Sequence, residues 1–235
     1  MQCVVLAGGL GTRMRAYNAQ VPKALLEVAG RPFAHWQLEW LAGQGVDEVV
    51  FSIGHLGALI EDALGSGRQW GVAIRYLRED EGALLGTGGA VRRAVDSGLL
   101  GSTFFVLYGD SYLEVNLRDV HRMLEQSTCS AVMTVFENRS RWDVSNVVVE
   151  GDRVARYEKG LIDSPPEMQF IDYGVSLLTA ASVTRLIPPG GPSDLAPYFS
   201  HLAATGELAA FEATERFYEV GSPEGLAALD RHLRR

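Results

Sequence analysis

A glycine-rich segment near the N-terminus carries residue types that bind phosphate. It reads Leu6-Ala7-Gly8-Gly9-Leu10-Gly11-Thr12-Arg13 and follows a short apolar run. Small residues let backbone N–H groups approach phosphate oxygens closely, and a planar guanidinium such as that of Arg13 suits a polyphosphate. The segment therefore indicates binding of a triphosphate tail, with a purely structural turn as the alternative.

Two other phosphate-binding motifs can be tested against the same residues. A dinucleotide fingerprint counted from Gly9 requires glycine where the chain has Met14, and no GKS or GKT sequence occurs. The dinucleotide and P-loop motifs are therefore excluded. Pro22 disfavours helix in the residue before it and should hold this segment extended, so that Lys23 can point back toward the glycine segment. A solvated surface turn is the alternative for an isolated Pro-Lys pair.

A carboxylate suited to a metal ion follows a later apolar run. The run Phe105-Val106-Leu107-Tyr108-Gly109 leads directly to Asp110. Magnesium prefers hard oxygen ligands and usually keeps only one or two carboxylates beside water and substrate phosphates. Asp110 is therefore a candidate ligand of Mg²⁺, with a structural aspartate capping the next helix as the alternative.

The combination of LAGGLGTR at 6–13 and PKALLEVAGRPF at 22–33 resembles the signature of the sugar-1-phosphate nucleotidylyltransferases. This resemblance implies a Rossmann-like three-layer α/β/α nucleotide-diphospho-sugar transferase fold. It also implies transfer of a nucleoside monophosphate to a sugar 1-phosphate, with Arg13, Lys23 and Asp110 as catalytic residues.

The resemblance assigns a second segment to the nucleotide. Leu85-Gly86-Thr87-Gly88-Gly89-Ala90 is similar to the element that lies against the nucleoside and opens a helix, and glycine there permits close approach to a flat base. Glu79 lies in a region that the family uses near the base, although an exposed acidic turn is an equal alternative. The implied nucleotide-binding residues are Leu6, Ala7, Gly8, Gly9, Gly11, Thr12, Arg13, Glu79, Gly86, Thr87, Gly88 and Asp110.

Three more segments extend the resemblance toward the C-terminus. YEVGSPE at 218–224 is similar to the family segment whose acidic residue is the second Mg²⁺ ligand, and it carries Glu219 where aspartate is commoner. Glu158-Lys159 resembles the acceptor-side pair, and Asp172-Tyr173-Gly174 departs from the usual N-A-G. The implied sugar-phosphate-binding residues are Lys23, Gly109, Glu158, Lys159, Asp172 and Gly174.

The substrates are expected from resemblance alone. The motifs look most like those of the guanylyltransferases for D-glycero-D-manno-heptose 1-phosphate, with the mannose 1-phosphate enzymes next, which implies GTP. Uridylyl, thymidylyl and cytidylyl transfer use the same scaffold and remain open. A non-catalytic nucleotide-sugar sensor is a further alternative, whereas a glycosyltransferase would more often show a D-x-D pair, and Asp110-Ser111-Tyr112 does not provide one.

The elements that must position these residues follow from hydrophobic periodicity. Strands are expected at 2–7, 48–53, 72–77 and 103–108, alternating with helices at 33–41, 56–64, 88–95 and 117–126. Such alternation predicts a mostly parallel sheet with helices on both faces and ligands at the carboxyl ends of its strands. After 130–136, strands at 146–150, 153–158 and 169–178 predict a small antiparallel section on the acceptor side. A helix at 194–204, a strand at 207–213 and a helix after Pro223 complete one expected domain, 1–235, without a C-terminal β-helix.

Composition limits the classes of partner. The chain has 235 residues, 47% hydrophobic and 21% charged, and a formal net charge of −8. An acidic chain is a poor general binder of nucleic acid, which requires a surplus of basic residues on one face. Cys3 lies in an apolar run, no stretch resembles a signal peptide or a membrane span, and the five histidines lack ligand spacing. We therefore expect a cytoplasmic enzyme without a membrane partner, for which a homodimer remains an option.

Overall fold

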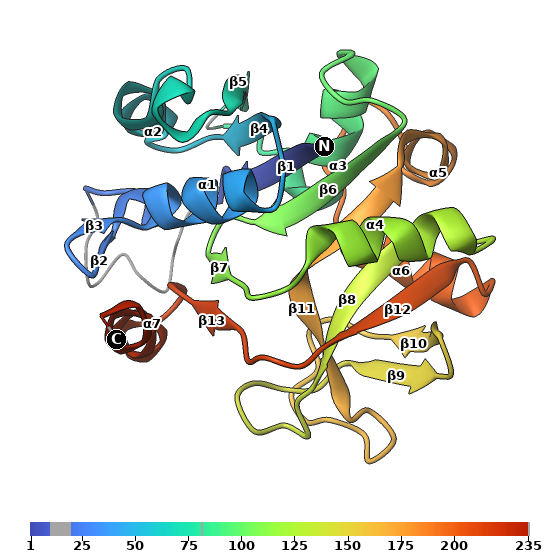
Figure 1. Cartoon of the computed structure of the whole chain (residues 1–235). Helices are drawn as coiled ribbons and strands as arrows, with labels where there is room; N and C mark the ends of the chain where they lie inside the picture. Colours follow the sequence, from blue (N-terminus) through green and yellow to red (C-terminus); the bar gives the residue numbers. More distant parts are fainter. Residues whose placement is uncertain (10–19, 81, 235) are drawn as a thin grey trace.

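The computed structural model describes residues 1–9, 20–80 and 82–234. Within these residues, the central sheet has nine strands in the order β5-β4-β1-β6-β11-β8-β12-β10-β9 (Figure 1). The strands of this sheet are β1 (Gln2–Ala7), β4 (Glu48–Ile53), β5 (Ala73–Arg78), β6 (Thr103–Tyr108), β8 (Ala131–Glu137), β9 (Val147–Glu150), β10 (Arg153–Tyr157), β11 (Phe170–Thr179) and β12 (Leu208–Ala213).

The helices cover both faces of this sheet. They are α1 (Phe33–Gly43), α2 (Gly57–Leu64), α3 (Gly86–Asp96), α4 (Leu117–Gln126), α5 (Ala180–Leu186), α6 (Leu195–Ala204) and α7 (Pro223–Leu233), with short 3-10 turns η2 (Lys23–Leu25) and η3 (Arg68–Trp70). Two small two-stranded sheets pair β2 (Glu27–Val28) with β3 (Arg31–Pro32) and β7 (Ser111–Tyr112) with β13 (Tyr218–Glu219).

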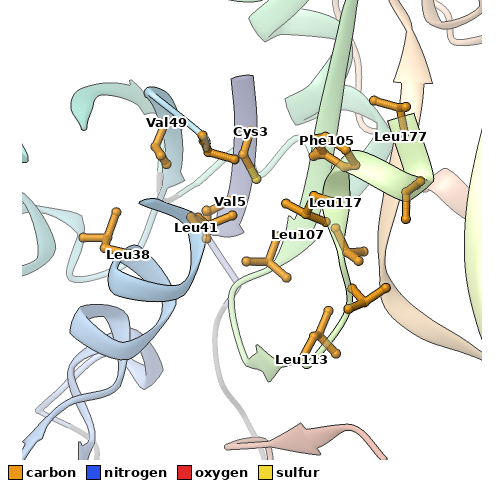
Figure 2. Close-up of a cluster of buried hydrophobic side chains, with 14 of the residues drawn as sticks. Cys3, Val5, Leu38, Leu41, Val49, Phe105, Leu107, Leu113, Leu117 and Leu177 are labelled. Carbon is orange, nitrogen blue, oxygen red and sulfur yellow. The ribbon is translucent and has the colours of Figure 1, made fainter. Parts of the chain in front are cut away.

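Side-chain alternation along the strands produces two cores, one on each face of the sheet. Cys3 and Val5 of β1 belong to the core under α1, α2 and α4, whereas Val4 belongs to the core under α3, α5 and α6. All three side chains are fully buried. Figure 2 shows the first core, where Leu38 and Leu41 of α1 face the strand residues. Because successive side chains of a strand point to opposite faces, near-continuous apolar strands require this three-layer arrangement.

The predicted fold class is confirmed, but the antiparallel part of the sheet is larger than the sequence indicated. The pairs β5–β4, β4–β1, β1–β6 and β8–β12 are parallel, and those involving β9, β10 or β11 are antiparallel. The sheet is therefore mixed, and "mostly parallel" describes only its β5-β4-β1-β6 half. The cause is β11, which enters the centre of the sheet antiparallel to both β6 and β8 instead of lying in a separate section.

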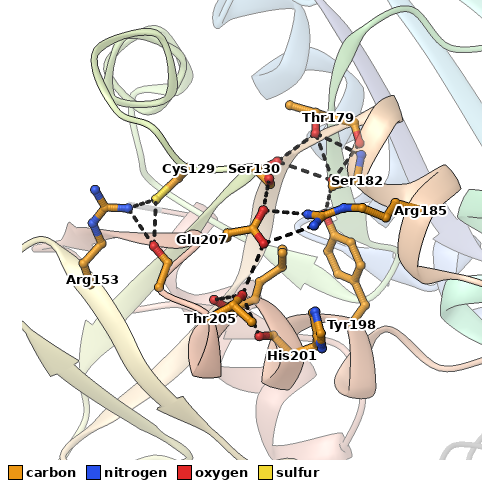
Figure 3. A network of polar contacts seen from close by, with 12 residues as sticks. Cys129, Ser130, Arg153, Thr179, Ser182, Arg185, Tyr198, His201, Thr205 and Glu207 are labelled. Carbon is orange, nitrogen blue, oxygen red and sulfur yellow. Dashed lines mark hydrogen bonds and ion pairs between the residues drawn. The ribbon is translucent and has the colours of Figure 1, made fainter.

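A polar network ties α5 and the residue before β8 to the loop between α6 and β12. Glu207 accepts hydrogen bonds from Ser130 Oγ at 2.5 Å and from Arg185 Nη2 at 2.6 Å (Figure 3). Thr205 Oγ1 donates a further bond to Glu207 at 3.3 Å. These bonds hold the pKa of Glu207 down to about 2, with the Arg185 contact as the largest cause. The same network places Arg153 against the partly exposed thiol of Cys129.

The described part of the chain contains no helix with the length and apolar character that crossing a bilayer requires.

Candidate active site

Lys23 and Asp110 meet in an ion pair at the carboxyl end of β6. Lys23 Nζ lies 2.9 Å from Asp110 Oδ2, and the two side chains are 22% and 29% exposed. Pro22 has extended backbone, but the extended segment expected here ends at once, because a 3-10 turn begins at Lys23. The structure thus brings together two of the predicted catalytic residues, with both charged groups partly open to solvent.

The predicted second metal ligand, Glu219, lies on a strand that runs beside Asp110. Strand β13 pairs antiparallel with β7, so that Glu219 is opposite Ser111. The Val220 N–H also donates to the Asp110 carbonyl oxygen at 2.9 Å. Asp110, which directly precedes β7, and Glu219, which lies on β13, are therefore neighbours in the fold although they are distant in the chain.

These two residues fit the modest protein requirement of a magnesium ion, which takes one or two carboxylates and fills its other positions with water and phosphate oxygens. Among the described residues, no group of three or more histidine, cysteine or acidic side chains could hold a metal. A site that relies on protein ligands alone, such as a structural zinc site, is therefore not present in that part of the chain.

Gly109 and Gly174 allow β1 and β11 to approach the segment that follows β6 closely. The Gly109 N–H donates to the Leu6 carbonyl at 3.1 Å, and a Cβ on Gly109 would lie 2.6 Å from that oxygen. Gly174 has a φ of +106°, and a Cβ there would lie 2.9 Å from Ser111 Oγ. Both predicted acceptor-side glycines therefore have a steric role beside the ion pair, where a larger side chain would push β1 or β11 away from Asp110.

Glu79 joins the glycine loop to the loop that precedes α3. Its carboxylate accepts hydrogen bonds from Ser52 Oγ at 2.7 Å and from the Leu85 N–H at 2.8 Å. A Cβ on Gly8 would lie 2.7 Å from Glu79 Oε1. The predicted position of Glu79 beside the nucleotide elements is consistent with these contacts, which give it the function of an anchor between β4 and this loop.

The glycines at the start of α3 pack against the segment 191–194. Gly86 has a φ of +67°, and a Cβ there would lie 2.5 Å from the Ser193 carbonyl oxygen. The Gly88 and Gly89 N–H groups donate to the same oxygen at 2.9 and 3.1 Å. We predicted that these glycines permit close approach of a base, and the close approach present in the structure is that of the 191–194 backbone.

Asp172 lies on β11 at an interruption of the strand register with β8. Its Oδ1 accepts from the Gly174 N–H at 3.0 Å, and the Tyr108 side chain lies nearby. Burial raises the pKa of Asp172 to about 6, against the opposing effects of the Gly174 N–H and the nearby Lys159 charge. The departure from the family's usual asparagine therefore places at this position a carboxyl group whose pKa is raised by burial.

The predicted pair Glu158-Lys159 has partners within the protein. Glu158 Oε1 lies 2.6 Å from Arg156 Nη2, and Lys159 Nζ lies 3.2 Å from both carboxylate oxygens of Asp194. Burial acts to raise the pKa of Asp194, but the Ala196 N–H and Lys159 outweigh it and lower this pKa below its ordinary value. The Lys159 ammonium is therefore balanced by the Asp194 carboxylate, whose pKa is lowered.

The family follows from a comparison with protein-family models. The model for the MobA-like NTP transferase domain matches residues 3–216, which span every element described above except the C-terminal strand and helix. The chain belongs to this family. The match of a nucleoside-triphosphate transferase domain agrees with the phosphate chemistry that the glycine segment, Lys23 and Asp110 indicate.

The curated relatives to which this MobA-like chain is similar are named for different substrates. The chain is 40% identical to the N-acetylmuramate alpha-1-phosphate uridylyltransferase of Neisseria meningitidis over 116 residues, which are 49% of each chain. It is 35% identical to the D-glycero-alpha-D-manno-heptose 1-phosphate guanylyltransferase of Aneurinibacillus thermoaerophilus over 118 residues, 50% of each chain. The matched region thus spans about half the length of these relatives.

A solved structure confirms the fold of this MobA-like transferase domain. The crystal structure of HddC from Yersinia pseudotuberculosis superposes with a TM-score of 0.81, at 22% identity and with 99% of each chain covered. The nucleotide-diphospho-sugar transferase fold expected from the motifs is therefore the fold of this chain.

Some predicted site residues fall outside the described residues, and some residues that contact the predicted site were not predicted. Gly11, Thr12 and Arg13 fall outside the described residues, so their predicted contacts with phosphate stay predictions. Conversely, sequence reasoning did not single out Tyr108 or Asp194, which contact Asp172 and Lys159. A local signal existed for Asp194, because an aspartate directly before an apolar helical run is a typical N-cap. Its pairing with Lys159 has no such signal.

Proposed function

We propose that this chain transfers a nucleoside monophosphate from a nucleoside triphosphate to a sugar 1-phosphate and releases pyrophosphate. The observation that carries the proposal is the Lys23–Asp110 ion pair, 2.9 Å long, at the strand end that contacts the glycine segment, with Glu219 on the neighbouring strand. A cation and two carboxylates at the end of a phosphate-binding loop suit phosphate chemistry and leave no role for a covalent nucleophile.

In this reaction an oxygen of the sugar phosphate forms a bond to the α-phosphorus, and the bond from the α-phosphorus to the bridging oxygen of the β-phosphate breaks. The attacking oxygen is already anionic, so no general base is needed. The protein contributes positioning and charge neutralisation. In this proposal Lys23 faces the reacting phosphates, and Arg13 stabilises the pyrophosphate that leaves.

The metal in this proposal is magnesium, held by Asp110 and Glu219. The Val220 N–H bond to the Asp110 carbonyl, 2.9 Å long, supports it because this bond fixes β13 beside the residue that bears the first carboxylate. When bound, Mg²⁺ supplies positive charge to the phosphate oxygens. The chain's own residues orient the substrates around that position, and the ion pair with Lys23 aligns the Asp110 carboxylate.

We propose GTP and D-glycero-D-manno-heptose 1-phosphate as the first substrate pair to test. The heptose 1-phosphate guanylyltransferase that is 35% identical over half of the chain supports it, together with the motifs. UTP and N-acetylmuramate 1-phosphate are the second candidate pair, because the uridylyltransferase with that acceptor is 40% identical over a similar length. GTP with mannose 1-phosphate completes the comparison. The acceptor is expected to lie between Lys159 and Asp172, whose charges are compatible with one phosphate and with sugar hydroxyls.

The test is pyrophosphate release with each nucleotide and sugar 1-phosphate combined in turn. One pair is expected to give turnover that stops on chelation and returns with Mg²⁺. Asp110→Asn and Lys23→Met should each lower that turnover about a hundredfold or more, as for other groups that stabilise charge in the reacting complex. Asp119→Asn, which removes an exposed ion pair with Arg122 on α4, serves as the matched control and should keep full activity.

The outcome also separates the other classes of function. A nucleotide-sugar sensor would bind one pair but release no pyrophosphate from any combination. A glycosyltransferase would consume a finished nucleotide sugar instead of a sugar 1-phosphate. Near-normal turnover by Asp110→Asn under saturating substrate would show that the ion pair has another purpose and would refute the proposal.

A further inference from the structure

A single carboxylate, Asp194, connects the acceptor-side lysine to the nucleotide-side helix α3. Lys159 Nζ lies 3.2 Å from Asp194 Oδ1 and also 3.2 Å from Oδ2. Asp194 is the N-cap of α6, and its Oδ1 accepts from the Ala196 N–H at 2.8 Å. The residue therefore has a fixed place at the start of a helix, from which it holds the ammonium group.

On its other side, Asp194 contacts Thr87 in the first turn of α3. Thr87 Oγ1 accepts a hydrogen bond at 2.9 Å from the N–H of Leu195, the residue that directly follows Asp194. Thr87 belongs to the segment that the motifs assign to the nucleotide. Its side chain is therefore engaged with the start of α6, and a continuous series of contacts runs from Thr87 through Asp194 to Lys159.

The backbone beneath this series of contacts is held closely. The Gly88 N–H donates to the Ser193 carbonyl at 2.9 Å, and a Cβ on Gly88 would lie 2.9 Å from the Asp194 carbonyl carbon and oxygen. Only a residue without a side chain fits at position 88. The distance between α3 and Asp194 is consequently set by direct backbone contact and does not depend on flexible side chains.

The Lys159–Asp194 pair is too exposed to matter much for folding. The two side chains are 45% and 47% exposed, and ion pairs of that kind contribute little to stability. Asp194 is nevertheless anchored apart from Lys159, because its side chain caps α6 through the Ala196 N–H and the neighbouring Leu195 N–H is bonded to Thr87. An anchored carboxylate next to a long flexible lysine acts mainly on where the ammonium group lies, which favours a positioning role over a stabilising one.

We propose that Asp194 is a positioning residue that holds Lys159 in a fixed place relative to α3. Through it, the phosphate of the acceptor is placed relative to the nucleotide bound at the start of that helix. This inference rests on the proposed function, because it assigns the acceptor phosphate to Lys159. Asp194 itself does not contact the reacting atoms. Its contribution is preorganisation, since a lysine side chain otherwise loses rotamer freedom when it binds an anion.

The first test is Asp194→Asn, measured with the nucleotide and sugar 1-phosphate on which the unchanged chain is most active. Asparagine caps a helix as well as aspartate does, so the melting temperature should not change. Loss of the negative charge should raise the KM for the sugar 1-phosphate about two- to fivefold, the range that corresponds to an exposed ion pair, and leave the KM for the nucleotide unchanged. Asp119→Asn is the control for loss of an exposed carboxylate elsewhere.

The second test approaches the same contacts from Thr87. Thr87→Val removes the hydroxyl, whereas Thr87→Ser keeps it. Although Thr87 lies on the nucleotide element, Thr87→Val should raise the KM for the sugar 1-phosphate, whereas Thr87→Ser should leave this KM unchanged. The double variant Thr87→Val with Asp194→Asn should have the same KM for the sugar 1-phosphate as Asp194→Asn alone. A merely structural role would give effects that multiply and that follow the melting temperature.

Several results would overturn the inference. An active unchanged chain whose Asp194→Asn variant has an equal or lower KM for the sugar 1-phosphate, or a raised KM for the nucleotide alone, refutes the positioning role and leaves the proposed function intact. An unchanged chain that releases no pyrophosphate with any substrate pair refutes the proposed function, and the positioning role with it.

Discussion

Gly109 directly precedes Asp110 and lies against the end of β1. In Gly109→Ala the new Cβ would lie 2.6 Å from the Leu6 carbonyl oxygen and 3.0 Å from Ala7 Cα. Both are backbone atoms of β1, and β1 is bonded in register to β4 and β6. The conflict therefore cannot be relieved by a side-chain rotation, and the chain around Asp110 has to move.

The size of the effect follows from these distances. A carbon–oxygen contact of 2.6 Å must open by roughly an ångström to reach an ordinary van der Waals separation. Such overpacking typically costs about 1–3 kcal/mol of stability. Because a displacement of about 1 Å at a reacting centre can cost about a hundredfold in rate, we expect kcat/KM to fall between about tenfold and a hundredfold.

The assay combines thermal unfolding with pyrophosphate release. Gly43→Ala is the matched control, since Gly43 ends α1 and a Cβ there meets nothing within 4 Å. Alanine is the better helix former, so this control should be neutral or slightly stabilising and fully active. A Gly109→Ala variant with the same melting temperature and the same kcat/KM as the unchanged chain would refute the steric reasoning. That result would mean that β1 and β6 can separate without moving Asp110.

Further predictions concern titrating groups. The pKa of Glu207 is lowered from 4.5 to about 2, chiefly by Arg185, so its stabilising contribution is complete above pH 4.5 and is lost as pH falls toward 2. Glu207→Gln should therefore lower the free energy of unfolding by about 1–2 kcal/mol at pH 7, measured by chemical denaturation. This difference from the unchanged chain should shrink as pH falls from 4.5 to 2. The pKa of Asp172 is raised from 3.8 to about 6 by burial, so ionisation of this group above that pH opposes folding. Asp172→Asn keeps an acceptor for the Gly174 N–H, and it should be about 1–2 kcal/mol more stable than the unchanged chain at pH 8 and equally stable below pH 4. A constant difference across either range would contradict the assigned cause.

The fold was predictable wherever local hydrophobic patterning determines an element. The expected bounds of β1, β4, β6 and α4 agree with the structure, because each is a buried run or a strongly amphipathic stretch with clear ends. Helix α5 was not predicted, although Thr179 at its N-cap accepts a hydrogen bond from the Ser182 N–H. Its seven residues directly follow a long strand, so the periodic signal is too short to separate the two elements.

The candidate site was predictable in its residues more than in its contacts. Strand ends identify where Gly8 and Asp110 must lie, since ligands of a parallel sheet collect at the carboxyl ends of its strands. The pairing of β13 with β7 could not be foreseen, because each strand has two residues and their partner is distant in the chain. The antiparallel entry of β11 between β6 and β8 is likewise a choice among registers that local patterns leave open.

A small third hydrophobic core explains how three distant segments come to lie near Asp110. Leu26, which follows the turn that begins at Lys23, and Val220, which follows Glu219, belong to the same buried cluster, together with Leu229 of α7. Val220 and Leu229 are fully buried, and the Val220 N–H is bonded to the Asp110 carbonyl. Packing of α7 against this cluster thus helps to hold both Lys23 and Glu219 near Asp110. Since neither short segment could hold its place alone, the geometry of the site depends on the apolar contacts beneath it as much as on the ion pair within it.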